Sequence, residues 1–419
     1  MRFVADFHLH SKYARATSPR CDPDGLAEGS KIKGIDIIAT GDYTHPVYFE
    51  ELKAKLQNEE EGLFPYKGVR FILSCEISLI YPNEKKGRYD RMHHLVLTDS
   101  LETVAQINDR LSRYGDLKAD GRPILKMSSA HFAEEIFSIS NKNVIIPAHV
   151  WTPHFSVFGS VGGVNSMEEA FADKADKIFA IETGLSSDPA MNWMLSGLDK
   201  YTLVSNSDAH SLEKLGREAN VFDLKRPTYD SLIEAVRTRK GFVKTYEFYP
   251  EEGKYHYDGH RDCKTVLAPW ETEEKNGLCP VCKKKVTVGV LNRVYQLSDR
   301  KLGFRPKNAV DFQHIVPLPT IISKAIKKPE TSKKVAEEYS KIVRYFGTEF
   351  ALFDAPEDKI RFATSNEIAD AIIKVRQGNI SWVPGYDGAF GELILKSDKI
   401  SPASKKKSVD RMQKKLDEY

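Results

Sequence analysis

Eight histidines and carboxylates lie in or beside short apolar segments, close to where the strands of an α/β fold would end. They are His8, His10, Asp42, Glu76, His94, His149, Asp208 and His210. The strands of an α/β barrel end at one rim, so side chains far apart in the sequence can meet there. Imidazole and carboxylate groups together favour Zn, Mn or Fe over the hardest cations. The sequence therefore predicts a multinuclear metal centre.

Two pairs of these residues have the spacing of chelating pairs. Residues two positions apart in an extended segment point to the same side, which pairs His8 with His10 and Asp208 with His210. One glutamate can bridge two ions. We therefore expect Glu76 to be a shared ligand and a catalytic residue.

Other histidines lie near these positions, and their roles must be assigned. His93 and His94 are adjacent, so they cannot both project to the same side of a strand, and we favour His94. His154 follows His149 in the next loop. We expect His154 to take part in catalysis with Glu76.

Seven short apolar segments alternate with helix-like segments in the first part of the chain. They span residues 2–7, 35–40, 69–80, 92–97, 144–148, 178–181 and 202–204. Strands that alternate with helices predict a parallel sheet. We predict a seven-stranded (β/α) barrel over residues 1–248.

The composition is that of a globular protein. The chain has 419 residues, of which 41% are hydrophobic. Its apolar runs are shorter than the roughly 18 residues of a membrane span, and Met1 leads directly into a strand-like segment. We expect a cytoplasmic protein with no membrane partner.

A second metal motif lies in residues 249–302. His260 and Cys263 are separated by two residues, fifteen residues follow, and Cys279 and Cys282 repeat the short spacing. Thiolates and imidazole spaced in this way wrap a tetrahedral ion, and a closed site of four protein ligands is structural. We predict structural Zn²⁺, with His256 as the alternative to His260.

Positive charge and aromatic rings are concentrated beside these motifs. Residues 278–308 carry eight Lys/Arg and one acid, which favours a polyanion. We expect contacts to this polyanion from Lys283, Lys284, Lys285 and Arg293, and aromatic stacking from Trp151 and Phe155 in the loop after His149. A mainly helical domain is predicted over 303–400, followed by a flexible tail over 401–419.

The motifs of the first half resemble those of the polymerase-and-histidinol-phosphatase (PHP) superfamily. The resemblance covers residues 1–245 and rests on His8-Leu9-His10, Gly41-Asp42, Glu76, His149 and Ser207-Asp208-Ala209-His210. It implies a seven-stranded barrel with a trinuclear metal site that hydrolyses phosphoesters. Many members have a histidine where this chain has Asp42.

The order of elements along the whole chain is similar to that of the endonuclease Q family. The zinc motif follows the barrel, and Val383-Pro384-Gly385-Tyr386-Asp387-Gly388 comes after both. The resemblance implies a DNA-repair endonuclease that nicks the phosphodiester 5′ to uracil, hypoxanthine, xanthine and abasic sites. Damaged DNA would then be the partner, and the lesion would be extruded from the duplex.

The expected chemistry is metal-assisted hydrolysis. A metal-bound water becomes the nucleophile near neutral pH, while the ions bind the phosphate oxygens and the leaving group. Zn²⁺ is the first choice at this centre, and Mg²⁺ and Mn²⁺ remain open. A small-molecule phosphatase of the histidinol-phosphate type is the alternative, but it gives no role to the zinc motif or to the residues after it. A binding protein with an inactive barrel would have lost its ligands, whereas eight candidates are present.

The last residues resemble a peptide that docks on the sliding clamp of DNA replication. Gln413, Leu416 and Tyr419 are spaced by three, which would place Leu416 and Tyr419 as apolar anchors one helical turn apart. The usual peptide ends in two aromatic residues, and this chain has one. The sequence therefore suggests the clamp as a second partner.

Overall fold

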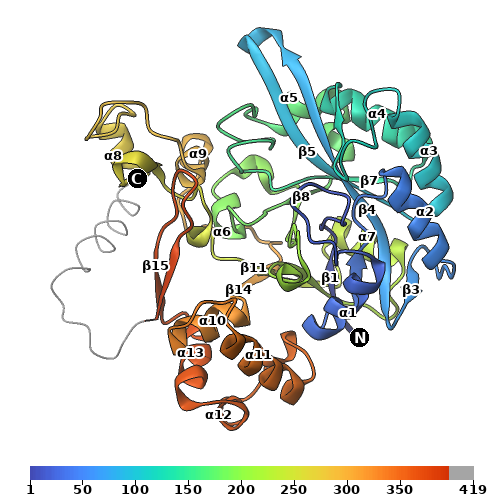
Figure 1. Ribbon diagram of the computed structural model, residues 1–419. Helices are drawn as coiled ribbons and strands as arrows, with labels where there is room; N and C mark the ends of the chain where they lie inside the picture. The colour runs from blue at the N-terminus through green and yellow to red at the C-terminus, as the bar shows by residue number, and fades with distance from the viewer. Residues whose placement is uncertain (396–419) are drawn as a thin grey trace.

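The computed structural model describes residues 1–395 and contains one large mixed sheet, curled strongly on itself (Figure 1). The hydrogen-bonded path through this sheet is β14-β11-β10-β1-β2-β4-β5-β7, with β3 and β6 paired to β4. Its strands are β1 (Arg2–Asp6), β2 (Ile37–Ala39), β3 (Phe64–Tyr66), β4 (Val69–Asn83), β5 (Arg88–Thr98), β6 (Ile124–Leu125), β7 (Val144–Pro147), β10 (Ala219–Asp223), β11 (Phe242–Glu247) and β14 (Asp311–His314). The strands β8 (Ala180–Glu182) and β9 (Thr202–Val204) form a separate parallel pair.

The predicted α/β class is correct, but the expectation of parallel strands throughout is wrong. Strand β2 is parallel to β1 and β4, whereas β4–β5, β5–β7, β1–β10 and β10–β11 are antiparallel. Strands buried on both faces read as continuous apolar runs in either direction, so the pattern cannot distinguish the two pairings. The closed seven-stranded barrel stays a prediction.

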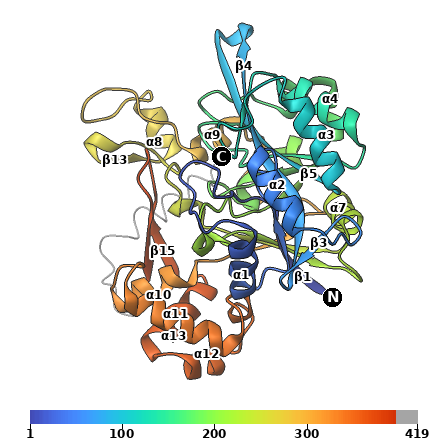
Figure 2. The ribbon, with the colours of Figure 1, turned by 45° about the vertical axis from the view of Figure 1, so that its right-hand side comes forward.

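The long hairpin of β4 and β5 carries the centre of the sheet. It projects beyond the other elements in both views (Figures 1 and 2), while its inner half, from Val69 to Leu79, is almost entirely buried. The register pairs Ser78 with His93 and Ile77 with His94. Paired residues share a face and neighbours alternate, so His93 lies on the face of Glu76 and His94 lies on the opposite face.

Seven helices accompany the sheet: α1 (Pro23–Lys33), α2 (Pro46–Lys55), α3 (Leu101–Leu111), α4 (Ser129–Ile139), α5 (Met167–Phe171), α6 (Pro189–Asn192) and α7 (Tyr229–Thr238). Local sequence defines several of their ends: Asp22 accepts a hydrogen bond from Gly25 N at the start of α1, and Thr228 forms a capping box with Ser231 at the start of α7. Leu232 of α7 packs with Phe7 and Leu95 of the sheet, and this apolar layer supports the strand ends.

The second half of the chain forms two smaller units. The first holds β12 (Asp258–His260), β13 (Thr265–Leu267), α8 (Pro269–Glu274) and α9 (Val290–Leu297). Strand β14 then returns to the large sheet beside β11. The last unit holds α10 (Leu318–Ile326), α11 (Lys333–Phe346), α12 (Glu357–Ala363), α13 (Asn366–Arg376) and the hairpin of β15 (Ile380–Val383) and β16 (Glu392–Leu395), with a core of its own.

Polar contacts join these units. Lys33 of α1 forms a buried ion pair with Glu349, 2.6 Å between Nζ and Oε2, in the connection after α11. The turn between β15 and β16 reaches the β12 unit, where Arg261 N donates a 2.6 Å hydrogen bond to Asp387 Oδ2. None of the helices in residues 1–395 is long and apolar enough to cross a membrane. The predicted clamp-binding residues Gln413, Leu416 and Tyr419 lie outside the described residues.

Gly184, directly after Thr183 at the end of β8, provides a test of this packing. Its φ is +64°, and a Cβ there would overlap the Cβ of His149. We expect Gly184→Ala to lower the free energy of unfolding by about 1–3 kcal/mol, from backbone strain and overlap. Gly197→Ala is the matched control, since Gly197 has no atom within 4 Å of the added Cβ. Urea titration measures both, and equal midpoints would contradict the expectation.

Candidate metal centre

Four predicted residues converge from three separate segments. His8 and His10 follow β1, Glu76 lies within β4, and Asp208 follows β9, and one ligand atom from each lies within 4.8 Å of all the others. His10 Nε2 is 3.1 Å from Glu76 Oε2 and 3.2 Å from Asp208 Oδ1. His8 Nε2 is 3.5 Å and 3.6 Å from the same two oxygens.

The atoms at the centre of this group have no hydrogen-bond partner. Nε2 of His8, Nε2 of His10 and Oδ1 of Asp208 are all buried and unsatisfied. The other ring nitrogens are held from behind: His8 Nδ1 is 3.0 Å from both oxygens of Glu182, and His10 Nδ1 is 3.0 Å from Asp42 Oδ1. A carboxylate behind a histidine fixes the tautomer that turns Nε2 toward a metal. The donor set therefore fits a divalent cation.

A second group shares Glu76. Its Oε1 is 2.7 Å from His93 Nδ1 and 2.9 Å from His149 Nε2, and these two nitrogens are 3.3 Å apart. Glu76 thus directs Oε2 to the first group and Oε1 to the second. This is the arrangement that a glutamate bridging two ions requires.

The electrostatics of the two groups differ. Burial lowers the pKa of His8, but Glu182, Glu76 and Asp208 outweigh it and raise this pKa well above its usual value. Burial lowers the pKa of His93 to about 4, despite the neighbouring Glu76. The first group favours positive charge at its centre, from protons or a metal ion, and His93 is neutral at pH 7 as a ligand must be.

Three non-glycine residues in or beside the two metal groups have a left-handed backbone conformation. The φ angles are +44° at Asp42, +32° at His149 and +46° at Asp208. Such conformations are costly for residues with a side chain, and they gather at functional sites where surrounding structure enforces them. Each of the three follows a strand and turns its side chain toward the clusters.

The structure corrects the choice between His93 and His94. His94 lies on the other face of β5, where its Nε2 is 2.8 Å from Ser129 Oγ and its ring packs against Phe132 and Phe171. Burial lowers its pKa to about 3, so it is a neutral core residue. The pairing register with β4, which the sequence does not reveal, decides the matter.

Asp42 and His210 lie beside the first group and are not part of it. Asp42 Oδ2 accepts a 2.5 Å hydrogen bond from Ser11 N, while its Oδ1 faces His10. The His210 ring lies 4.4 Å from the His10 ring, and His210 Nδ1 is 3.0 Å from the carbonyl oxygen of Asp208. The described contacts give Asp42 an orienting role, and His210 flanks the group.

Two residues at the site were missed by sequence reasoning. Glu182 is fully buried and contacts His8, His149 N and Asn206. It follows the predicted segment 178–181, so the rule that polar residues end strands would have found it. Arg122 Nη1 donates a 3.0 Å hydrogen bond to Glu76 Oε2 from a loop without a recognisable motif.

The loop after His149 contains three of the predicted site residues, and it departs from expectation at Trp151. Trp151 is buried completely and donates a 2.8 Å hydrogen bond to Asn192 Oδ1, so it cannot stack on a ligand as predicted. His154 is exposed and lies outside both metal groups, and its part in catalysis stays a prediction. Phe155 is half-buried, and its ring lies 4.8 Å from the ring of His93. Apolar residues of a loop can pack inward as well as outward, and the sequence pattern does not separate the two.

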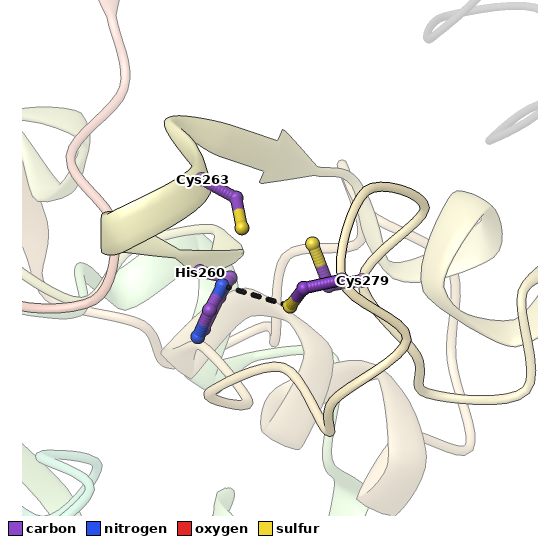
Figure 3. A group of neighbouring side chains, drawn as sticks. His260, Cys263 and Cys279 are labelled. Atoms are coloured by element: carbon purple, nitrogen blue, oxygen red, sulfur yellow. Dashed lines mark hydrogen bonds between the residues drawn. The ribbon is translucent and has the colours of Figure 1, made fainter.

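The predicted zinc ligands gather in the β12 unit. His260, Cys263, Cys279 and Cys282 offer four atoms within 4.8 Å of one another, and Cys282 Sγ is 3.4 Å from His260 Nδ1. Figure 3 shows the Cys263 and Cys279 sulfur atoms directed, with His260, into the same small space. His256 is buried elsewhere, with its ring 5.2 Å from that of Tyr257. Three thiolates and one imidazole fit a tetrahedral Zn²⁺.

The predicted basic contacts divide into two kinds. Lys283, Lys284 and Lys285 are exposed beside the cysteine knuckle. Arg293, in contrast, is half-buried and donates to the carbonyl oxygens of Phe158 and Val164 at 3.0 and 3.1 Å. Its guanidinium fixes the loop that follows His149, and its contact with a polyanion stays a prediction.

Comparison with known proteins finds two short matches to family models. Residues 200–240 match the family model described as PHP-associated, and residues 317–379 match that of the MJ0043 C-terminal domain. The first match places a PHP-associated domain in the same chain as the clusters of histidine and carboxylate around Glu76.

The particular resemblance is to endonuclease Q. The crystal structure of the lesion-specific endonuclease from Pyrococcus furiosus has a TM-score of 0.85 and 29% identity, and covers 98% of this chain and 99% of that one. Endonuclease Q bound to a 27-mer duplex with an abasic lesion at the active site has the same TM-score and identity, over 97% of this chain and 100% of that one. The resemblance predicted from the motifs is confirmed: this chain is a structural relative of endonuclease Q.

Two uncharacterised proteins are similar in sequence. YqxK of Bacillus subtilis is 28% identical over 382 residues, which are 88% of this chain and 91% of that protein. MJ0043 of Methanocaldococcus jannaschii is 27% identical over 346 residues, which are 78% of this chain and 43% of that protein.

The placement of His93 and His94 predicts opposite effects of two adjacent substitutions. His93→Ala should lower the metal content of the purified protein, because it removes a nitrogen that faces Glu76 and His149. His94→Ala should keep the metal but cost about 2–4 kcal/mol of stability, since it removes a buried ring and strands Ser129. Elemental analysis and urea denaturation measure the two effects. Metal loss caused by His94→Ala alone would contradict the observed register.

The four candidate zinc ligands of the β12 unit lead to a second prediction about metal content. Cys279→Ala combined with Cys282→Ala should remove one zinc per chain and lower the stability of the β12 unit, because ligation contributes directly to the folding of small zinc modules. Cys21→Ala is the control, as Cys21 is buried and lies outside the metal groups. Unchanged zinc content in the double variant would refute the assignment.

Proposed function

We propose that this protein is a metal-dependent DNA repair endonuclease that cuts the phosphodiester 5′ to deaminated bases and abasic sites. The observation that carries the proposal is the pair of groups sharing Glu76, set in a chain that is similar over nearly its full length to an endonuclease whose structure holds abasic DNA at the active site. Divalent ions bound there would activate water and neutralise charge on the phosphate.

Different residues of the chain would bind the two ions. His8, His10 and Asp208 would hold one ion and His93 and His149 a second, with Glu76 between them. Zn²⁺ suits both donor sets, and Mg²⁺ and Mn²⁺ remain alternatives at the carboxylate-rich first group.

Supporting side chains keep this donor set in place. Glu182 and Asp42 orient the histidines through their far nitrogens. The described residues offer no protein nucleophile within either group, since both contain only histidines and carboxylates that face one another.

Recognition of the lesion would use surfaces around the groups. The ring of Phe155 packs at a tilt against His93, and Arg91 lies 5.9 Å from the centre of the Phe155 ring. An extruded base could therefore meet an aromatic side chain beside the metals. The exposed Lys283, Lys284 and Lys285 of the zinc element would contact the phosphate backbone and position the duplex without reading its sequence.

Asp208 provides the test of this proposal. Asp208→Asn should abolish nicking of an oligonucleotide duplex with one abasic site or one uracil, because it removes a charged ligand while preserving shape. Asp109→Asn is the matched control, as Asp109 is exposed on α3. Cleavage is followed on denaturing gels with Mn²⁺ or Zn²⁺, and duplex binding by fluorescence anisotropy should survive in both variants.

The same assay distinguishes the alternatives. An undamaged duplex and a simple monophosphate are run in parallel. Turnover of the monophosphate with intact lesion DNA would favour a small-molecule phosphatase. Full nicking by Asp208→Asn would remove these groups as the active site.

A further inference from the structure

Arg122 brings a permanent positive charge to the edge of the metal groups. It lies in the loop between α3 and β6, and its Nη1 is 3.0 Å from Glu76 Oε2. Its side chain is 31% exposed, whereas that of Glu76 is 0% exposed. Within residues 1–395, no other lysine or arginine forms an ion pair with the side chain of Glu76 or Asp208. Arg122 thus connects the buried bridge to the solvent side of the site.

The backbone around Arg122 is fixed on both sides. Gly121 N donates to Tyr13 O at 3.0 Å, and Pro123 O accepts from Ser78 N at 3.0 Å. A Cβ on Gly121 would lie 2.5 Å from Asp42 Oδ2, so this loop packs directly against the carboxylate that orients His10. The side chain therefore extends from a rigid base, as electrostatic preorganisation requires.

A structural ion pair with Glu76 uses only part of the guanidinium. The group has five N–H donors in a planar fork that matches phosphate oxygens, and Nη1 is the nitrogen bonded to Glu76. The remaining donors lie on a partly exposed side chain. They are available to an anion that approaches the groups from solvent.

Charge at the site makes such a donor necessary. The ligands Glu76 and Asp208, with Asp42 and Glu182 behind them, surround the histidines with carboxylates. A phosphodiester is itself anionic, and it must approach these groups closely. Bound divalent ions would offset these carboxylates, and a cation on the solvent side would add to their attraction for the phosphate and stabilise the negative charge that develops on it.

We propose that Arg122 is a catalytic residue that binds a non-bridging oxygen of the scissile phosphate through the donors that Glu76 leaves free. The assignment rests on the proposed phosphodiester cleavage at these groups. It gives one side chain two tasks: Nη1 holds the bridging carboxylate, and the rest of the fork holds the substrate.

The experiment compares Arg122→Ala and Arg122→Lys with Arg110→Ala. Arg110 is a matched control, because it forms an ion pair with Glu135 on the surface of α3 and α4, away from the groups. Three quantities are measured on metal-loaded protein: metal content per chain, binding of inorganic phosphate by calorimetry, and single-turnover cleavage of bis(p-nitrophenyl) phosphate and of abasic DNA.

For Arg122→Ala we expect unchanged metal content and phosphate affinity weaker by about tenfold or more. Cleavage of both substrates should fall by about 10²–10³-fold, the usual effect of removing one donor to a developing oxyanion. Added guanidinium ion should restore part of the activity of Arg122→Ala. The phosphate affinity and cleavage rate of Arg122→Lys should lie between those of the unchanged protein and those of Arg122→Ala, because lysine keeps the positive charge and lacks the planar fork of donors.

Two results would overturn the assignment. Metal loss that parallels the loss of activity would mean that Arg122 only positions Glu76. Unchanged phosphate affinity in Arg122→Ala would mean that Arg122 does not contact the substrate. The outcomes for the endonuclease are separate. If phosphate binding depends on Arg122 but the protein leaves abasic DNA intact, the endonuclease proposal is refuted and the assignment of Arg122 is kept. If Arg122→Ala nicks abasic DNA fully, the assignment is refuted and the endonuclease proposal is kept.

Discussion

The carboxylate of Glu76 is the group on which the site depends. It is fully buried in the middle of β4, and an ionised carboxylate is costly to bury unless positive charge and hydrogen-bond donors surround it. Burial raises its pKa, but His93, Arg122 and His8 outweigh this effect, and the pKa is well below the usual value. Each oxygen therefore faces its own set of partners, and the two metal groups exist because one side chain belongs to both.

The surrounding residues keep this carboxylate and its partners in a fixed geometry. Glu182 holds His8 and the backbone of His149 together, although these residues come from different strands. The left-handed backbone at His149 and Asp208 turns their side chains inward. The strain is tolerated because β8, β9 and the packed interior of the sheet leave the chain few other conformations.

The zinc element is connected to this centre through Arg293. From α9, its guanidinium donates to Phe158 O and Val164 O in the loop that also contains Phe155. Phe155 in turn packs on His93. Folding of the β12 unit around a bound ion would therefore also order a wall of the candidate metal site.

The sequence by itself determined which chemistry is present. Short spacing placed His8 with His10 and Cys279 with Cys282, because residues so close in the chain cannot move far apart. The alternation of short apolar segments with helix-like segments indicated an α/β fold. The sequence did not determine strand direction, the face that His93 or His94 occupies, or the burial of Trp151 and Arg293. Those features depend on the register of β4 against β5 and on packing between distant segments. Only the tertiary structure could bring Glu182 to His8 and Arg122 to Glu76, because these contacts join residues that are 174 and 46 positions apart in the chain. No local pattern records which of many buried or loop residues will meet.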